Sequence, residues 1–127
     1  MIDDAAIAAG LDRLRAVVAP LPECEVSGEQ HHAFRVRKKV FAFHTVDHHG
    51  DGRVSLVCKA ERGELEALVE ADPVRFFRPP YMAHHGYIGV HLDVDRVDWE
   101  EIAEQLVEAY RLAAPKTLVA RLDAPPA

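Results

Sequence analysis

The sequence predicts an α+β domain in which an antiparallel sheet is covered by helices on one face, a two-layer arrangement. Three observations lead to this fold class. Apolar residues recur at helical spacing near both ends of the chain. Between residues 33 and 59 they alternate with polar residues, as in half-buried strands. The resulting order is helix, three strands, helix, strand, helix, which is typical of an α+β fold.

The first predicted helix covers residues 3–19. Ile7, Leu11, Leu14 and Val18 form its apolar stripe, the acidic first turn suits the helix dipole, and Pro20 ends it. Residues 21–28 are less regular. Somewhere along the chain, at no particular position, the pattern leaves room for one further strand.

Three strands are predicted next, at residues 33–37, 39–46 and 53–59. The last two form a hairpin, because residues 47–52 are rich in turn formers. A short helix over 64–71 ends at Asp72-Pro73, and a fourth strand covers 87–92. The final helix runs from Asp98, its predicted N-cap, to about residue 114, and Pro115 kinks or restarts it.

The length and composition agree with one domain over residues 1–127. Hydrophobic residues make up 49% and charged residues 28% of the 127 residues, which is ordinary for a soluble globular protein. No apolar stretch is long enough to cross a bilayer, and the acidic N-terminus lacks the pattern of a secretory signal. These features predict a cytoplasmic protein without a membrane partner.

The net charge of −6 is unevenly distributed. Residues 1–34 carry 2 basic and 6 acidic side chains, residues 35–62 carry 7 basic and 3 acidic, and residues 63–127 carry 6 basic and 12 acidic. The middle of the chain is therefore a basic segment between two acidic ones, and such a segment bears on partners more than on fold.

Four sequence blocks resemble the MmcQ/YjbR family: RKKVFAF (37–43), SLVCKA (55–60), RFFRPPYM with HHGYIGVHLD (75–93) and VDWEEIAEQLVEAYRLAAPKTL (97–118). They follow the family's order between residues 37 and 118. The resemblance implies the YjbR/CyaY-like fold, which is compared with secretion chaperones. It also implies a small cytoplasmic protein with no established reaction, and some members are proposed to bind DNA through a double-wing surface. It implies no catalytic residue.

The strand alternation predicts a polar outer face on the sheet. Phe41 and Phe43 are predicted to face the core, and the residues between the apolar positions to face outward. The predicted outer face carries Arg35, Arg37, Arg53, Lys59, His44, Tyr87 and His91, and Lys39 adds to its charge. Such a set suits an anionic partner, although a polar open face is also common for solubility alone.

The first functional hypothesis is therefore binding of DNA or another anionic partner by the residues Arg35, Arg37, Lys39, Arg53, Lys59, Tyr87 and His91. The alternative is a non-enzymatic protein–protein adaptor or homodimer. A third hypothesis is an enzyme that uses His84, His85 or His91 near Tyr81. No complete catalytic motif supports it, so we expect no enzymatic activity and no cofactor.

For the remaining candidate residues the sequence favours structural roles over functional ones. The eight histidines include no His-x-x-x-His or His-Glu-x-x-His pattern, so no metal site is predicted. Residues 93–98 resemble a calcium loop only in part. Cys24 and Cys58 form no redox motif, and Cys58 is predicted to be buried in a strand. Phe76, Phe77 and Tyr81 are expected to anchor the Pro79-Pro80 loop to the core.

Overall fold

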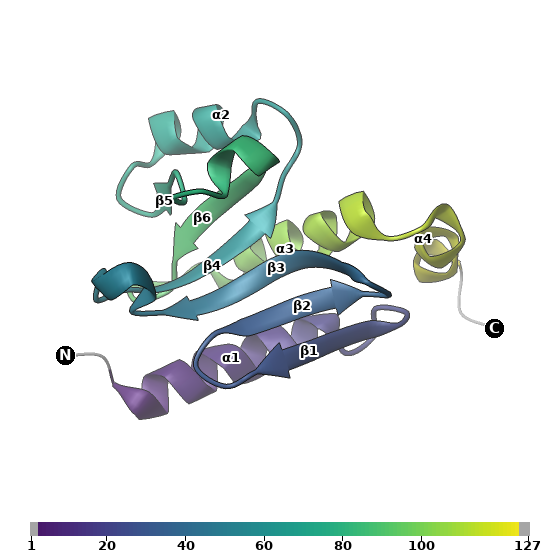
Figure 1. The fold of residues 1–127 in the computed structure, drawn as a ribbon, viewed down its shortest axis with the longest axis horizontal. Helices are drawn as coiled ribbons and strands as arrows, with labels where there is room; N and C mark the ends of the chain where they lie inside the picture. Colours follow the sequence, from purple (N-terminus) through teal and green to yellow (C-terminus); the bar gives the residue numbers. More distant parts are fainter. Residues whose placement is uncertain (1–2, 125–127) are drawn as a thin grey trace.

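The fold is built around one antiparallel sheet. The computed structural model describes residues 3–124, and within them six strands lie in the order β1-β2-β3-β4-β6-β5 (Figure 1). The strands are β1 (Cys24–Gly28), β2 (His32–Val36), β3 (Lys39–Val46), β4 (Val54–Lys59), β5 (Phe76–Phe77) and β6 (Tyr87–His91). Together with the helices they confirm the predicted α+β class.

Two long helices cover one face of this sheet. Figure 1 shows α1 (Asp4–Val18) and α3 (Trp99–Ala113) behind the strands, while α2 (Glu64–Ala71) lies beside β5 and β6. The short α4 (Lys116–Asp123) follows Pro115 at the right of the view. Both long helices begin at a capping aspartate: Asp3 accepts a hydrogen bond from the Ala5 amide, and Asp98 accepts one from the Glu101 amide.

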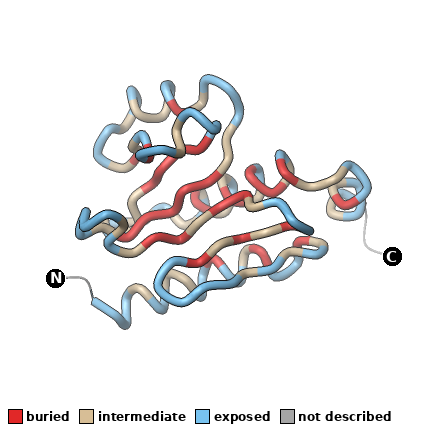
Figure 2. Tube along the Cα trace, viewed as in Figure 1, coloured by how far each residue is buried: buried red, intermediate tan, exposed pale blue. Residues whose placement is uncertain are grey.

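The hydrophobic core lies between the sheet and these two helices. Figure 2 shows buried residues along the middle strands and on the inward sides of α1 and α3. Phe41 of β3 meets Tyr110 of α3 edge to face, with 5.7 Å between ring centroids. The Tyr110 hydroxyl donates a 2.7 Å hydrogen bond to the Pro22 carbonyl, which fixes the segment before β1 to α3.

Most predicted elements are present, and two strands were missed. No helix among residues 3–124 has both the length and the apolar character needed to span a bilayer. The missed β1 carries the alternation of Cys24 and Val26 with Glu25 and Ser27, which is a readable strand signal. The other missed strand, β5, has only two residues and is too short to show any period.

The prediction that Phe43 faces the core and His44 faces outward is wrong. Phe34 of β2 is opposite Ala42, but the next residue, Arg35, is opposite Val40, so Phe41 is an extra residue in β3. Such a bulge shifts the alternation of the bulged strand by one residue. Beyond it, His44 is buried on the helix-covered face, and Phe43 lies on the other face.

Two further predictions are corrected. Arg37 lies not on β2 but in the tight turn before β3, with φ of 54°. Tyr81 does not anchor its loop to the core, because 76% of its surface is exposed. Phe76, which is 2% exposed, and the half-buried Phe77 hold that loop instead. Cys58 is fully buried in β4, as expected.

Candidate functional site

The outer face of the sheet, the one away from α1 and α3, is apolar at its centre. Strand pairing sets one row of residues across five strands: Ala33, Phe43, Val57, Gly89 and Phe77. The Phe77 ring lies directly on Gly89, and a β-carbon at residue 89 would overlap the ring. Gly89 therefore lets the loop that follows β5 fold down onto the sheet.

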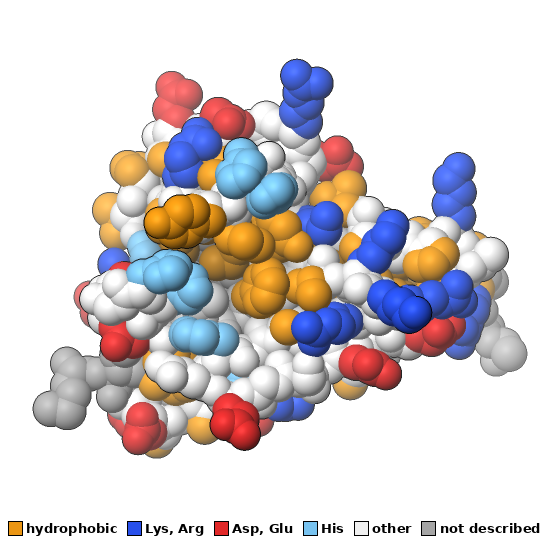
Figure 3. Space-filling view, in the orientation of Figure 1, with side chains coloured by type: hydrophobic (Ala, Val, Ile, Leu, Met, Phe, Trp, Pro, Cys, Tyr) orange, Lys and Arg blue, Asp and Glu red, His pale blue; other side chains and the backbone are white. Residues whose placement is uncertain are grey.

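An apolar groove opens beside this row. It encloses about 500 Å³ between the sheet and the loop after β5. Its walls are mostly apolar side chains and include Phe43, Val57, Phe77, Pro79, Pro80 and Met82. Figure 3 shows hydrophobic side chains gathered in the middle of the outer face.

Histidines line one side of the groove. The ring centroids of His31 and His48 are 5.1 Å apart, those of His48 and His49 are 4.0 Å apart, and His49 lies 5.8 Å from Tyr81. Burial, and then the charges of His49 and His31, lower the pKa of His48. This row of rings thus forms an aromatic rim that ends at the exposed Tyr81.

The next row of the outer face carries two cations, Arg35 and Lys59, and Glu25 of β1 lies opposite Arg35. Arg35 is opposite Val40, and Lys59 is opposite Tyr87, one outward-facing position along the strands from Phe43 and Val57. That step is about 7 Å. The Lys59 ammonium lies 5.5 Å from the centre of the Tyr87 ring, and Arg35 donates a 2.7 Å hydrogen bond to Ser27. Neither cation is paired with a carboxylate of residues 3–124.

Two of the predicted cations are neutralised by neighbouring carboxylates. Arg37 forms two 3.2 Å hydrogen bonds to Glu23, and Arg53 binds Asp93 through contacts of 2.8 to 3.1 Å. The arginine in each pair lowers the pKa of its carboxylate. The sequence showed the basic segment, but not that acidic residues far along the chain would reach it.

A third predicted cation, Lys39, lies on the other side of the sheet. Its partner across the turn is Val36, whose side chain packs into the core, so the two share the helix-covered side. The outer face therefore keeps two unpaired cations of the predicted five, Arg35 and Lys59. Figure 3 shows further Lys and Arg side chains near the β2–β3 turn and α4.

The two predicted polar aromatics, Tyr87 and His91, are less exposed than expected. Tyr87 is 7% exposed and donates a 3.1 Å hydrogen bond to the Val40 carbonyl. His91 stacks on Phe77 with 4.3 Å between centroids, and its Nδ1 lies 3.1 Å from the Ser55 hydroxyl. Burial lowers the pKa of His91. Each residue contacts one wall of the groove: Tyr87 packs against Phe43, and His91 against Phe77.

Ser55 and His91 are the residue types of a nucleophile and its general base, but a substrate in the groove could not reach them. Ser55 is 1% exposed, and neither residue lines the groove. Burial raises the pKa of the Cys58 thiol to about 12, and burial followed by the charge of Glu25 raises that of Cys24 to about 11. Both thiols are therefore protonated at neutral pH and are poor nucleophiles.

No group of three or more His, Cys, Asp or Glu side chains within residues 3–124 is arranged to hold a metal ion. The histidines of the groove rim are joined by ring contacts rather than aimed at one point. His31 has a separate role, since its Nδ1 accepts a 3.2 Å hydrogen bond from the Val46 amide.

Comparison with known proteins identifies the family. The family model described as YjbR matches residues 19–112. The chain belongs to the YjbR family. No protein with a curated description matches this YjbR member. Its fold is similar to a crystal structure of Deinococcus radiodurans protein DR2400, described as having a DUF419 domain, with a TM-score of 0.70 and 23% identity. The similarity covers 91% of this chain and 88% of that one.

Proposed function

We propose that this YjbR protein acts by binding rather than catalysis, and that its outer sheet face binds single-stranded nucleic acid. In this proposal a base enters the apolar groove between Phe43 and Phe77, and phosphates lie along the row of Arg35 and Lys59. One observation carries this proposal: two unpaired cations, Arg35 and Lys59, lie beside the apolar groove, whose walls include two aromatic rings. Single-strand binding commonly combines these two features.

The distance between the two cations suits a nucleic-acid strand that runs across the β-strands of the sheet. Arg35 on β2 and Lys59 on β4 are separated by two strand spacings, about 10 Å. The groove adjoins this row on one side, and Tyr81 stands exposed at its rim. Stacking on such aromatic side chains contributes about 1–3 kcal/mol per base.

The ion pairs of Arg37 and Arg53 limit how strongly charge contributes. Two phosphate contacts predict a slope of about −1.4 for the logarithm of the binding constant against the logarithm of salt concentration, whereas five would predict about −3.5. Affinity is therefore expected to be modest and to depend more on base stacking than on salt.

The test is fluorescence anisotropy with a labelled oligothymidylate at low salt. Arg35→Gln combined with Lys59→Gln should weaken binding and flatten its salt slope. The matched control is Arg62→Gln combined with Arg96→Gln, which removes the same charge from exposed sites outside the strands. Tyr81→Ala should weaken binding about tenfold or more, and Tyr81→Phe should retain it. Absence of binding at low salt, or equal losses in both double variants, would rule the proposal out.

A second candidate is a protein–protein adaptor in which the groove is closed by a second copy of the chain. Tyr81 favours it, since an exposed aromatic beside an apolar groove resembles the anchors of protein interfaces. It predicts a concentration-dependent homodimer in light scattering that Tyr81→Ala dissociates. A monomer at all concentrations would count against it.

A further inference from the structure

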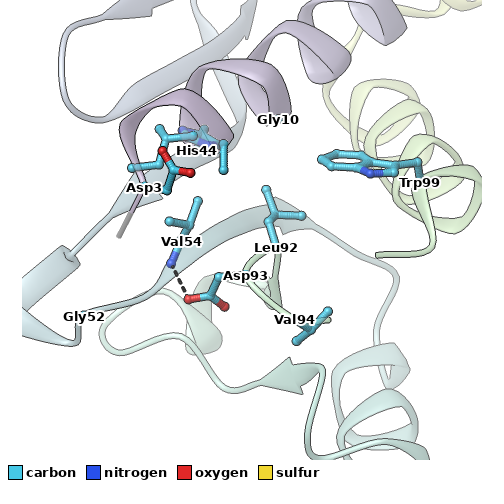
Figure 4. A pocket seen from close by; sticks show the side chains of 11 residues that line it. Asp3, Gly10, His44, Gly52, Val54, Leu92, Asp93, Val94 and Trp99 are labelled. Atoms are coloured by element: carbon cyan, nitrogen blue, oxygen red, sulfur yellow. Dashed lines mark hydrogen bonds between the residues drawn. The ribbon is translucent and has the colours of Figure 1, made fainter. Parts of the chain in front are cut away.

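A second cavity lies on the opposite, helix-covered side of the sheet. It encloses about 450 Å³ between the first turns of α1, the inner side of β3 and β4, and the segment from Leu92 to Trp99. Figure 4 shows these walls, with Trp99 at one end and Asp3 near the other. The sheet separates it from the outer groove, and the two hollows have no lining residue in common.

Among the side chains that line this cavity, His44 is the buried one whose polar atoms lack a hydrogen-bond partner. Its side chain is 1% exposed, and neither Nδ1 nor Nε2 has a hydrogen-bond partner among the described residues. A buried polar atom without a partner is costly and uncommon in folded proteins. Burial, followed by the charges of His32 and His31, lowers the pKa of His44 to about 4. The neutral ring offers one donor and one acceptor.

The remaining walls define what else a ligand would meet. Most are apolar and include Ala6, Ile7, Val54, Leu92, Val94 and Trp99. The two carboxylates already have partners. Asp3 accepts from the Ala5 amide at 2.9 Å, while Asp93 binds Arg53 and accepts from the Val54 amide at 3.1 Å, the bond drawn in Figure 4. An anion would meet these carboxylates, and no lysine or arginine is among the described residues that line the cavity.

We infer that this cavity binds a small neutral amphipathic molecule, with its apolar body against Trp99 and Leu92 and one hydroxyl or amide group hydrogen-bonded to His44. Ligand pockets commonly combine apolar walls with one or a few buried polar groups that fix orientation. This site is independent of the nucleic-acid proposal, because its residues lie on the other side of the sheet.

The probes are phenol, toluene and benzoate, followed by NMR of the His44 ring nitrogens and the Trp99 indole. Phenol at millimolar concentration should shift both sets of resonances. Toluene lacks the hydroxyl and should bind about tenfold more weakly, since it leaves the buried nitrogen unpaired. Benzoate should not bind. Equal binding of phenol and toluene, or no shift with phenol, would overturn the inference.

Two substitutions test the location of the site. His44→Phe removes both ring nitrogens and should abolish the preference for phenol over toluene. Ala6→Trp should block the cavity from an exposed position on α1 and abolish binding of both, even if His44→Phe does not fold. Ala9→Trp is the matched control, because Ala9 is exposed on the same helix but does not line the cavity. Phenol binding unchanged in Ala6→Trp would overturn the inference.

Discussion

Gly89→Ala tests whether the outer groove depends on the close contact between Phe77 and the sheet. A β-carbon at this position would overlap three atoms of the Phe77 ring, Cζ, Cε1 and Cε2. The ring also stacks with His91, so it cannot tilt without losing that contact. The methyl group is therefore expected to displace Phe77 and to open the loop after β5.

The expected loss follows from two opposing contributions. Overpacking costs about 1–3 kcal/mol, whereas replacing glycine by alanine in a strand returns roughly 0.5–1 kcal/mol of backbone entropy. The net prediction is a decrease of about 1–2 kcal/mol in the free energy of unfolding. Urea denaturation followed by circular dichroism measures this difference, and the slope of the transition should not change.

A double-mutant cycle with Phe77→Ala isolates the overlap. Phe77→Ala alone should destabilise the protein, because the half-buried ring loses its contacts with Gly89 and His91. In the Gly89→Ala background the same change also relieves the overlap, so it should cost less, with a coupling of about 1 kcal/mol or more. Additive effects, or a Gly89→Ala variant as stable as the parent protein, would refute the contact.

Three further predictions concern the core and the helix ends. The pKa of His44 lies at about 4 in the folded protein against 6.5 for an unperturbed histidine, so below pH 6.5 the unfolded chain binds the extra proton. Its contribution to stability should be complete above pH 6.5 and fall by up to about 3 kcal/mol on acidification to pH 4; His44→Phe should flatten that part of a urea-denaturation pH profile. Asp98→Ala removes the N-cap of α3 and should cost about 1 kcal/mol in the same assay. Tyr110→Phe leaves the Pro22 carbonyl unpaired and should cost about 1–2 kcal/mol, with increased amide exchange in β1.

The secondary structure could be predicted largely from local pattern, because strands and helices each impose a period on the sequence. The bulge at Phe41 could not. Apolar and aromatic residues at 40, 41, 42 and 43 allow either alternation, and only the pairing of Arg35 with Val40 decides which one is realised. The burial of His44 and the outward position of Phe43 both follow from that pairing.

The basic character of the outer face was overestimated for a different reason. A charge count along the chain does not include partners that folding brings in from elsewhere. Asp93 lies 40 residues beyond Arg53, and Glu23 lies 14 residues before Arg37, yet each is an ion-pair partner in the fold. The groove was missed as well, since its walls combine β3, β4 and the Pro79-Pro80 loop.

One extra residue in β3 connects the two proposed sites. Before the bulge, Val40 faces the outer side beside Arg35; after it, Phe43 and Thr45 face the outer groove, and His44 faces the inner cavity. Without the bulge the same strand would place His44 in the outer groove and Phe43 in the inner cavity. Each site would then lose the group on which its proposal depends: the groove an aromatic wall, and the cavity its buried hydrogen-bonding ring. In both proposals the bulge therefore decides which side chain reaches the site, as expected for a feature that redirects side chains.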